Sequence, residues 1–589
     1  MKKGCMCHMK QNAKQLGRLF ALYIKTGRIY VWLYMLATLV KAFIPLIRVI
    51  AIARMITTFA HPQALAWLSV IVFCILYEDI YYKFCDFIDV FIIHNASLHT
   101  QTSLIQKAFS IPYVFWENSD LHNDIKLISE SSTVIHTTCK HIMTVIQRMI
   151  EFFSISVYVA SFSLLWGAGL ISVQLFSLYL YTKTANLSWK TTLGTTKDER
   201  EATYIMELLT SRKSIPEIQL FSSHIPLQNR YIQTTNRIIA IKKETMLKNM
   251  IIQYVPNLVL GALCIVMVLQ YTLMYTQQVI NGADLSGLLS SLLLMIGTVQ
   301  VFSINFNNMV TSYNKYRKYD IFIHQDFTIN HDNTQCISDC NMPVAMENCT
   351  FSYGTQTRKI IRNVSVSIAE GECIVIVGSN GCGKSTLVKL MLGLLHPHSG
   401  NVWIYGQSAT QVQDSERIVL SAIFQDYSKY RLQLDEIVAN GRSSDQDVAS
   451  LIEKVGLSST VARLENGYHT LLGKEFQGGT DLSEGQWQKV NVARVLASKA
   501  EVLIFDEPTA SLDPVTESLF YEEIVRLKSQ KTIVIVSHRL GVTRIADRVL
   551  YMEDGCIHAQ GTHQSLLETC AAYADMYQNQ AQWYGERSL

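Results

Sequence analysis

A glycine-rich stretch, GSNGCGKST, separates an apolar run from a segment with helical periodicity. It fits the spacing G-x4-G-K-[ST], in which a tight turn points successive backbone N–H groups at phosphate oxygens. The dipole of the following helix adds to this attraction. Lys384 would supply a positive charge to the β- and γ-phosphates, and Ser385 would offer its hydroxyl to Mg²⁺. The sequence therefore predicts a nucleotide site made of Gly378, Ser379, Asn380, Gly381, Cys382, Gly383, Lys384, Ser385 and Thr386.

A second apolar run, from Val502 to Phe505, ends in two acids. Asp506 is predicted to hold Mg²⁺, and Glu507 to orient and deprotonate an attacking water, because phosphoryl transfer depends on positioning and charge neutralisation. In isolation the pattern would equally fit a strand that ends in a solvated acidic turn. Beside a phosphate-binding loop, the hydrolytic interpretation is favoured.

The composition indicates that a membrane protein positions this site. Of the 589 residues, 49% are hydrophobic and 17% are charged, and the mean hydropathy is +0.16. This combination indicates membrane-spanning segments in part of the chain. The formal net charge of +3 gives no electrostatic support for a nucleic-acid partner. The 13 cysteines have neither zinc-type spacing nor the density of a secreted framework, so we expect reduced thiols.

The first half contains six apolar runs of the length that a spanning helix needs, roughly 20 residues. A turn between the third and fourth is expected at the segment WGAG. The basic residues that precede the first run predict a cytoplasmic N-terminus, and six crossings then place the second half in the cytoplasm as well. The predicted spans are about 29–53, 64–92, 144–166, 168–190, 251–275 and 284–310.

The second predicted span carries an unusual number of charges, including Glu78, Asp79, Lys83 and Asp89. Intramembrane charge is costly and often marks a substrate pathway, and an acidic face would favour a cationic substrate. The alternative is local pairing, since Lys83 follows Asp79 by four residues. Lys41 and Arg48 of the first span are open to the same two interpretations.

The expected fold is a six-segment α-helical transmembrane domain followed by an α/β P-loop nucleotide-binding domain. A polar stretch with weak periodicity separates the two and has the character of a linker. The predicted layout is 1–28 basic N-terminal segment, 29–323 transmembrane domain, 324–343 linker, 344–582 nucleotide-binding domain and 583–589 C-terminal tail.

With these motifs in order, the second half resembles the nucleotide-binding domain of ATP-binding-cassette (ABC) transporters, and the first half resembles the membrane domain of the exporter type. The resemblance is specific over residues 345–570. It implies that Tyr353 in CTFSYG stacks on adenine and that His538 in IVIVSHRL contacts the γ-phosphate. Gln425 in AIFQDY would contribute to the metal site and to catalysis, and Asp513 would end the loop after the catalytic glutamate.

The same resemblance places a family signature at LSEGQ, where Ser483, Gly485 and Gln486 would contact ATP held by a second chain. The family form has glycine where this chain has Glu484. A glutamate in a first helical turn is favourable to the helix dipole, and Ser483 and Gln486 have capping-box spacing. We therefore expect a working variant, with a weakened site in a heterodimer as the alternative.

A narrower resemblance, carried by FQDYSKYRLQLDEIVANG and LGKEFQGGTDLSEGQWQK, is to bacterial exporters of lantibiotics and other modified peptides. It implies an ATP-driven, Mg²⁺-dependent homodimeric exporter of a peptide or amphipathic compound in the bacterial cytoplasmic membrane, in contact with membrane lipid. The polar inserts containing YVFWENSD and EIQLFSSH would carry coupling helices, and no N-terminal peptidase domain is expected. Gln477 replaces the family's usual acid before the signature. A multidrug exporter, a lipid or lipid-linked flippase, and one subunit of a heterodimer remain alternatives.

Overall fold

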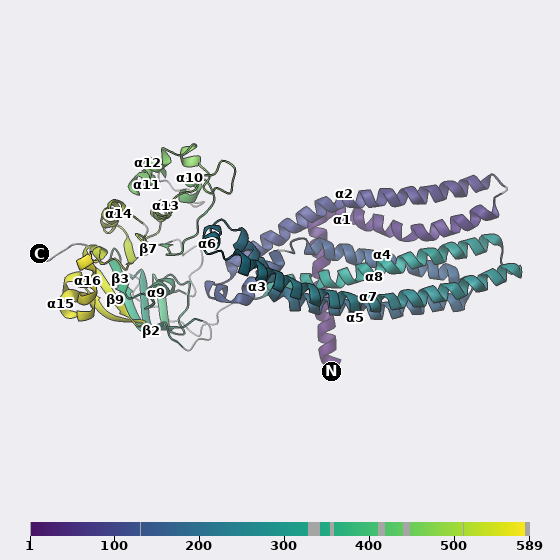
Figure 1. Cartoon of the computed structure of the whole chain (residues 1–589), viewed down its shortest axis with the longest axis horizontal. Helices are drawn as coiled ribbons and strands as arrows, with labels where there is room; N and C mark the ends of the chain where they lie inside the picture. Colours follow the sequence, from purple (N-terminus) through teal and green to yellow (C-terminus); the bar gives the residue numbers. More distant parts are fainter. Residues whose placement is uncertain are drawn as a thin grey trace. The chain divides into compact units, whose positions relative to one another are not determined.

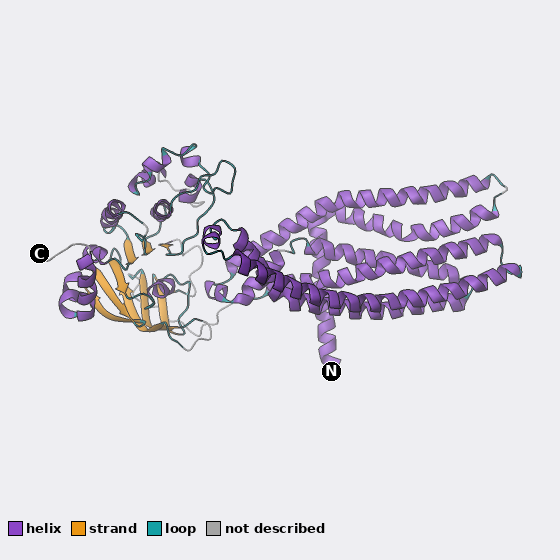
Figure 2. Ribbon diagram, viewed as in Figure 1, coloured by secondary structure: helices purple, strands orange, loops and turns teal. Residues whose placement is uncertain are grey.

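The computed structural model describes residues 2–59, 61–129, 131–327, 342–353, 358–409, 419–439, 448–510 and 512–583, and for residues 2–12, 119 and 581–583 only the backbone. The chain divides into two compact units. Unit 1 comprises Met1–Ser110 and Asp120–Asp326, and unit 2 comprises Ile111–Ser119 and Phe327–Leu589. The elements of unit 1 are helical, and the strands gather in unit 2 (Figure 2).

Unit 1 contains six helices that are long and apolar enough to cross a membrane, as predicted. Most extend well beyond the roughly 20 residues that a bilayer requires, so their ends project out of the apolar layer. α1 packs along α2, α4 along α8, and α5 along α7. The helices are α1 Lys2–Thr57, α2 Gln63–Ser110, α3 Ser119–Ser129, α4 Val134–Ala160, α5 Leu164–Thr210, α6 Ile215–Leu220, α7 His224–Thr276 and α8 Gly282–His324.

The backbone of α1 breaks at Arg28, whose φ of 44° and ψ of −123° are not helical. Figure 1 shows the N-terminal part of α1 running across the long helices of unit 1. The break coincides with the predicted boundary between the basic segment and the first span. Because positive φ is strained for a side-chain-bearing residue, the packing on both sides of Arg28 must hold this bend.

The turn predicted at WGAG is wrong. α4 ends at Ala160 and α5 begins at Leu164, so residues 161–163 make the turn and WGAG lies inside α5. The glycine there has a packing role, since a Cβ on Gly167 would lie 2.4 Å from the Cβ of Ala160. A glycine that permits two helices to approach closely has the same sequence appearance as a glycine that makes a turn.

Unit 2 is built on two sheets. A four-stranded antiparallel sheet has the order β2-β1-β4-β5, and a six-stranded sheet has the order β10-β9-β3-β8-β7-β6, parallel except for the β9–β10 pair. The strands are β1 Val344–Phe351, β2 Ile361–Ile368, β3 Cys373–Gly378, β4 Ser399–Ile404, β5 Gln407–Ser408, β6 Leu420–Ile423, β7 Val502–Asp506, β8 Thr532–Val536, β9 Arg548–Glu553 and β10 Cys556–Gly561.

Strand β3 explains why this sheet has a core on both faces. Val375 and Val377 pack into one apolar cluster, whereas Ile374 and Ile376 pack into another. Side chains alternate across a strand, and a parallel strand covered on both faces is a continuous apolar run. The helices of unit 2 are α9 Lys384–Met391, α10 Leu434–Ala439, α11 Val448–Lys454, α12 Ser458–Val461, α13 Glu484–Leu496, α14 Pro514–Leu527, α15 His563–Thr569 and α16 Ala571–Trp583.

The predicted linker at 324–343 falls for the most part outside the described residues, as does the tail after residue 583. On either side of the linker, α8 ends at His324 and β1 begins at Val344. Unit 2 also includes residues 111–119 from the first polar insert. There the Lys389 ammonium donates to the Tyr113 hydroxyl at 3.2 Å, and Val114 packs against a core cluster of the unit.

Candidate nucleotide site

The phosphate-binding loop connects β3 to α9. Gly378, Gly381 and Gly383 have φ values of 153°, 80° and 105°. A Cβ on Gly378 would lie 2.1 Å from the carbonyl oxygen of Met552, so the close approach of β9 also requires glycine there. The loop therefore has the tight turn that the sequence predicted, with α9 starting directly after it.

Lys384, the first residue of α9, is buried and its ammonium lies inside the loop. It donates to the carbonyl oxygens of Gly378 and Ser379 at 2.9 and 3.0 Å. These contacts hold the charge where the phosphates of a nucleotide would meet it. The Tyr353 and Thr386 hydroxyls lie 3.2 Å apart, which brings the predicted adenine-binding aromatic to the first turn of α9.

Asp506 ends β7 beside this loop and is 2% exposed. Its Oδ1 atom has no hydrogen-bond partner among the described residues. Burial raises the pKa of the Asp506 carboxyl above its usual range, and the Ser385 hydroxyl opposes that shift. A buried carboxylate oxygen without a donor is costly unless a cation binds it, so Asp506 and Ser385 fit the predicted metal site.

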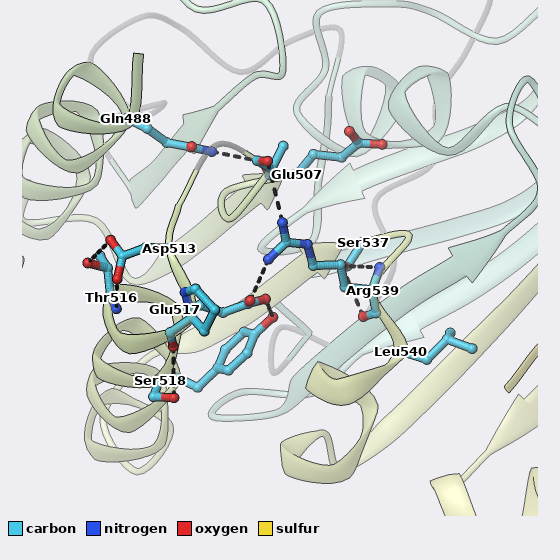
Figure 3. Close-up of polar contacts among 12 residues, drawn as sticks. Gln488, Glu507, Asp513, Thr516, Glu517, Ser518, Ser537, Arg539 and Leu540 are labelled. Carbon is cyan, nitrogen blue, oxygen red and sulfur yellow. Dashed lines mark hydrogen bonds and ion pairs between the residues drawn. The ribbon is translucent and has the colours of Figure 1, made fainter. Parts of the chain in front are cut away.

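Glu507 has an unusual backbone, with φ of 52°. Its N–H donates to Val536 at 2.9 Å, and its carbonyl oxygen accepts from the Gln488 side chain at 3.1 Å (Figure 3). Its carboxylate accepts from Gln425 Nε2 at 3.0 Å and lies 3.3 Å from His538 Nδ1. Three residues that the sequence analysis assigned separately, namely Gln425, Glu507 and His538, thus meet at one carboxylate.

The loop after Glu507 ends at Asp513, whose side chain bonds to Thr516 (Figure 3). Asp513 caps α14 by accepting from the N–H and the hydroxyl of Thr516 at 3.0 and 2.7 Å, and these bonds hold the pKa of its carboxyl below the usual range. Arg539, next to His538, pairs with Glu517 of α14. The predicted role of Asp513 at the end of this loop agrees with a cap position.

The signature residues form the N-terminus of α13. Ser483 is the N-cap and accepts from the N–H of Gln486 at 3.3 Å, while the Gln486 side chain accepts from the N–H of Ser483 at 2.8 Å. This is the predicted capping box. Gln486 also donates to the Thr460 hydroxyl at 3.2 Å. Among the described residues, Ser483 thus bonds to Gln486, and Gln486 bonds to Ser483 and Thr460, with no bond from either to the phosphate loop.

Glu484 is the first residue of α13, and its carboxylate is directed to a segment that follows Gln425. It forms an ion pair with Lys429. The Tyr427 hydroxyl lies 3.2 Å from the Glu484 carbonyl oxygen and 3.4 Å from its Oε2 atom. Burial raises the pKa of Tyr427 to about 12, and the Glu484 charge adds to the shift. The negative charge that replaces the family's glycine is thus compensated within the chain.

Three of the four acids of the second predicted span, Glu78, Asp79 and Asp89, have basic partners. Glu78 pairs with Lys41 and with Arg48 of α1, the latter at 3.3 Å. The local pair of Asp79 and Lys83 is also present, at 2.8 Å. The structure therefore favours pairing over an open acidic face, although the partners of Glu78 come from a neighbouring helix.

Asp89 of α2 is likewise buried. It pairs with Lys140 of α4 and lies 3.3 Å from His136 Nε2. Residues this far apart in sequence have no spacing rule, so the sequence could suggest only the local pair.

The sequence analysis missed Gln488, Lys429 and Tyr427. One signal was available for Gln488, because it lies four residues after Glu484 and hence on the same helix face. The contacts of Lys429 and Tyr427 with α13 join segments 55 and 57 residues apart. Nothing in one sequence indicates such a pair.

Comparison with known proteins agrees with this geometry. Residues 361–510 match the ABC transporter family. The chain is 27% identical to the nisin transport ATP-binding protein NisT of Lactococcus lactis, with 80% of each protein covered. It is 26% identical to the subtilin transport ATP-binding protein SpaT of Bacillus subtilis, over 82% of this chain and 80% of that one.

Among solved structures, an ATP-bound bacterial Atm1-family ABC exporter superimposes with a TM-score of 0.79 at 20% identity. The match covers 94% of this chain and 98% of the other, so both units share its fold. The phosphate loop, the acid pair and the six long apolar helices are thus found together in one known architecture. Residues 361–510 thus form an ABC ATPase domain, and the chain has the fold of an ABC exporter, with six helices long and apolar enough to cross a membrane.

Proposed function

We propose that this chain is an ATP-hydrolysing exporter of peptides that works as a homodimer in the cytoplasmic membrane of a bacterium. The N-terminus and unit 2 would lie in the cytoplasm, consistent with the basic residues before the first span. The observation that carries the hydrolytic part is the group around Glu507, with Gln425 and His538 on its two carboxylate oxygens. This is a suitable arrangement for orienting an attacking water.

The residues of the site fit ATP and Mg²⁺. The Gly378–Lys384 loop, with the Lys384 ammonium, would hold the phosphates, and Tyr353 would stack on the adenine. Asp506, Ser385 and Gln425 would hold Mg²⁺, which neutralises phosphate charge when bound. The partnerless Oδ1 atom of Asp506 supports the metal assignment.

A second chain is part of the proposal because the unit has one phosphate loop and one signature. Ser483 and Gln486 bond with each other at the start of α13. This leaves the N-terminus of α13 with the positive end of its dipole, which favours the phosphates of a nucleotide held by another copy.

The peptide part rests on the two relatives named for nisin and subtilin transport, which align over four-fifths of the chain. A feature of unit 1 is in keeping with it. A cavity of about 910 Å³ lies among α5, α7 and α8. Its lining has carboxamides at successive turns of α7 and no carboxylate, and its only charges come from Lys242 and Lys243. Carboxamides can donate to and accept from peptide groups. The uncharged polar side chains that line it are Ser188, Asn249, Gln253, Tyr254, Asn257, Gln300, Ser303 and Asn307.

The test uses the purified full-length chain in inside-out vesicles with ATP and Mg²⁺. Three fluorescent probes are compared: a linear peptide with neutral side chains, a lipophilic cation and a phospholipid. We expect ATP-dependent accumulation of the peptide alone, and none with the Glu507→Gln variant. Uptake of the cation, or transfer of the lipid between leaflets, in place of peptide uptake would replace the peptide proposal with the multidrug or flippase alternative.

A further inference from the structure

The carboxylate of Glu484 stands at a position where the family has no side chain, and it has specific partners. Lys429 forms an ion pair with it, and Tyr427 donates a hydrogen bond to it. The Lys429 side chain is 29% exposed and that of Glu484 is 67% exposed, so the contact lies at the surface of unit 2. With a pKa of about 12, Tyr427 stays a donor at neutral pH.

Both partners belong to the segment that begins with Gln425. The start of this segment is bound to the Glu507 carboxylate through Gln425 Nε2, at 3.0 Å. Its other end is bound to the first turn of α13 through Lys429. The segment is therefore held at one end by the hydrolytic acid and at the other by the signature helix.

A second contact joins the signature helix to Glu507. Gln488 lies one helical turn after Glu484, on the same face of α13, and donates to the Glu507 carbonyl oxygen at 3.1 Å. The signature helix thus contacts Glu507 directly through Gln488 and indirectly through the segment 425–429. Glycine at position 484 would keep the Gln488 contact and the Tyr427 bond to the backbone carbonyl of residue 484. It would remove the two contacts of the carboxylate, with Lys429 and with Tyr427.

We propose that Glu484 and Lys429 are positioning residues whose ion pair fixes the signature helix to the segment carrying Gln425. In the homodimer of the proposed function, on which this inference rests, the signature of a chain contacts the ATP held by its partner, whereas Glu507 and Gln425 serve the chain's own ATP. The ion pair therefore makes the residues of two different ATP sites move as one group.

The first experiment measures ATP turnover of the full-length chain in lipid for Lys429→Met, Glu484→Gln and the double variant. Each single change is expected to lower turnover about threefold, the scale of an exposed ion pair, and the double variant to be no slower than the slower single. Lys454→Met is the matched control, because it removes a lysine that is 3.6 Å from Glu523 at a site without nucleotide-binding residues. It should keep wild-type turnover.

The second experiment separates positioning from a general loss of structure. Mixed dimers are isolated with two different affinity tags, with Glu507→Gln in one chain so that only the other chain's Glu507 is active. Lys429→Met is then added to either chain. If the ion pair links the two ATP sites, Lys429→Met should lower turnover in whichever chain it is placed. In the active chain it would act through Gln425, and in the inactive chain through the signature.

A reduction in only one placement would overturn the inference, since the ion pair would then act on one site alone. Additive effects in the double variant would overturn it too. If the wild type hydrolyses ATP and both single variants hydrolyse it at the same rate, this inference is contradicted, but the proposed function is not. No turnover from a wild-type dimer of the correct mass that binds ATP would contradict the homodimer itself, and the thermal midpoint of each variant identifies any that fail to fold.

Discussion

Two carboxylates of unit 1, those of Glu78 and Asp89, form ion pairs, whereas among the described residues the buried carboxylate at the end of β7 in unit 2 forms none. Glu78 has Lys41 and Arg48, and Asp89 has Lys140. Asp506 is 2% exposed, against 25% for the Glu78 side chain, and its Oδ1 atom has neither a hydrogen bond nor an ion pair among the described residues. Burial of charge requires compensation, so the difference shows which acids complete the fold and which are kept for a ligand.

The largest expected effect concerns Glu507. Changing it to Gln should lower ATP turnover at least about 10²-fold, as expected for loss of a general base, while ATP binding persists. If Glu507 were a structural acid like those of unit 1, the variant would instead lose thermal stability and keep its turnover. Steady-state ATPase assays and equilibrium binding of a fluorescent ATP analogue decide between the two.

The next effect concerns a paired acid of unit 1. Glu78→Gln leaves Lys41, 3% exposed, without its carboxylate, and should destabilise the protein by about 3 kcal/mol. Replacing both residues, as Lys41→Met with Glu78→Gln, should recover most of this, because the deeply buried Lys41 charge is then removed and only Arg48, whose side chain is 21% exposed, lacks its partner. Thermal unfolding in detergent measures both variants. A double variant as unstable as the single one would mean that the pair has another role.

The acid without a cation should behave in the opposite way. Ionised Asp506 costs stability, since burial raises its pKa in the folded state. This cost grows as pH rises from the ordinary Asp pKa through the raised value, and it is complete above that value. In chelator at neutral pH, Asp506→Asn should therefore stabilise unit 2 by about 1 kcal/mol, the cost of an unsatisfied buried group.

The same Asp506→Asn variant should lose Mg²⁺-dependent turnover. Its stability advantage should vanish below about pH 4, where the wild-type carboxyl is protonated in both states. Thermal scans across pH, with and without Mg²⁺ and ATP, measure these changes. If Asp506→Asn is less stable than the wild type in chelator, Asp506 has a structural role like the acids of unit 1.

The smallest effect is expected at the exposed pair of Asp79 and Lys83, whose side chains are 66% and 77% exposed. Surface ion pairs contribute little. Asp79→Asn should therefore leave the unfolding midpoint unchanged within error, and it serves as the control for Glu78→Gln. A clear loss of stability would show that this exposed ion pair contributes as much to stability as the less exposed pairs.

The nucleotide site was predictable because its parts follow local rules. The glycines of the phosphate loop, the two acids after β7 and the capping box of α13 each depend on residues within a few positions. The contacts that assemble these parts were not predictable. Gln425 and Glu507 are 82 residues apart, and Lys429 and Glu484 are 55 apart, so only the fold determines their approach.

For unit 1, the length of the apolar runs predicted the number of helices but not the residues at which each helix ends. The apolar runs predicted six spans, and the described residues contain six helices long and apolar enough to cross a membrane. Their ends extend further because helices of this kind continue into polar sequence, where length and hydropathy carry no signal. Gly167 misled the prediction of a turn, since its requirement is contact with Ala160.

The left-handed backbone of Glu507 sets selection for activity against selection for stability. A φ of 52° suits glycine or asparagine better than glutamate, so the chain retains a strained residue where a relaxed one would fold more readily. In related proteins that no longer need to hydrolyse ATP, we expect the residue at position 507 to be among the first to be substituted. Glycine or asparagine at this position in a related chain would then mark a lineage that binds ATP without turning it over.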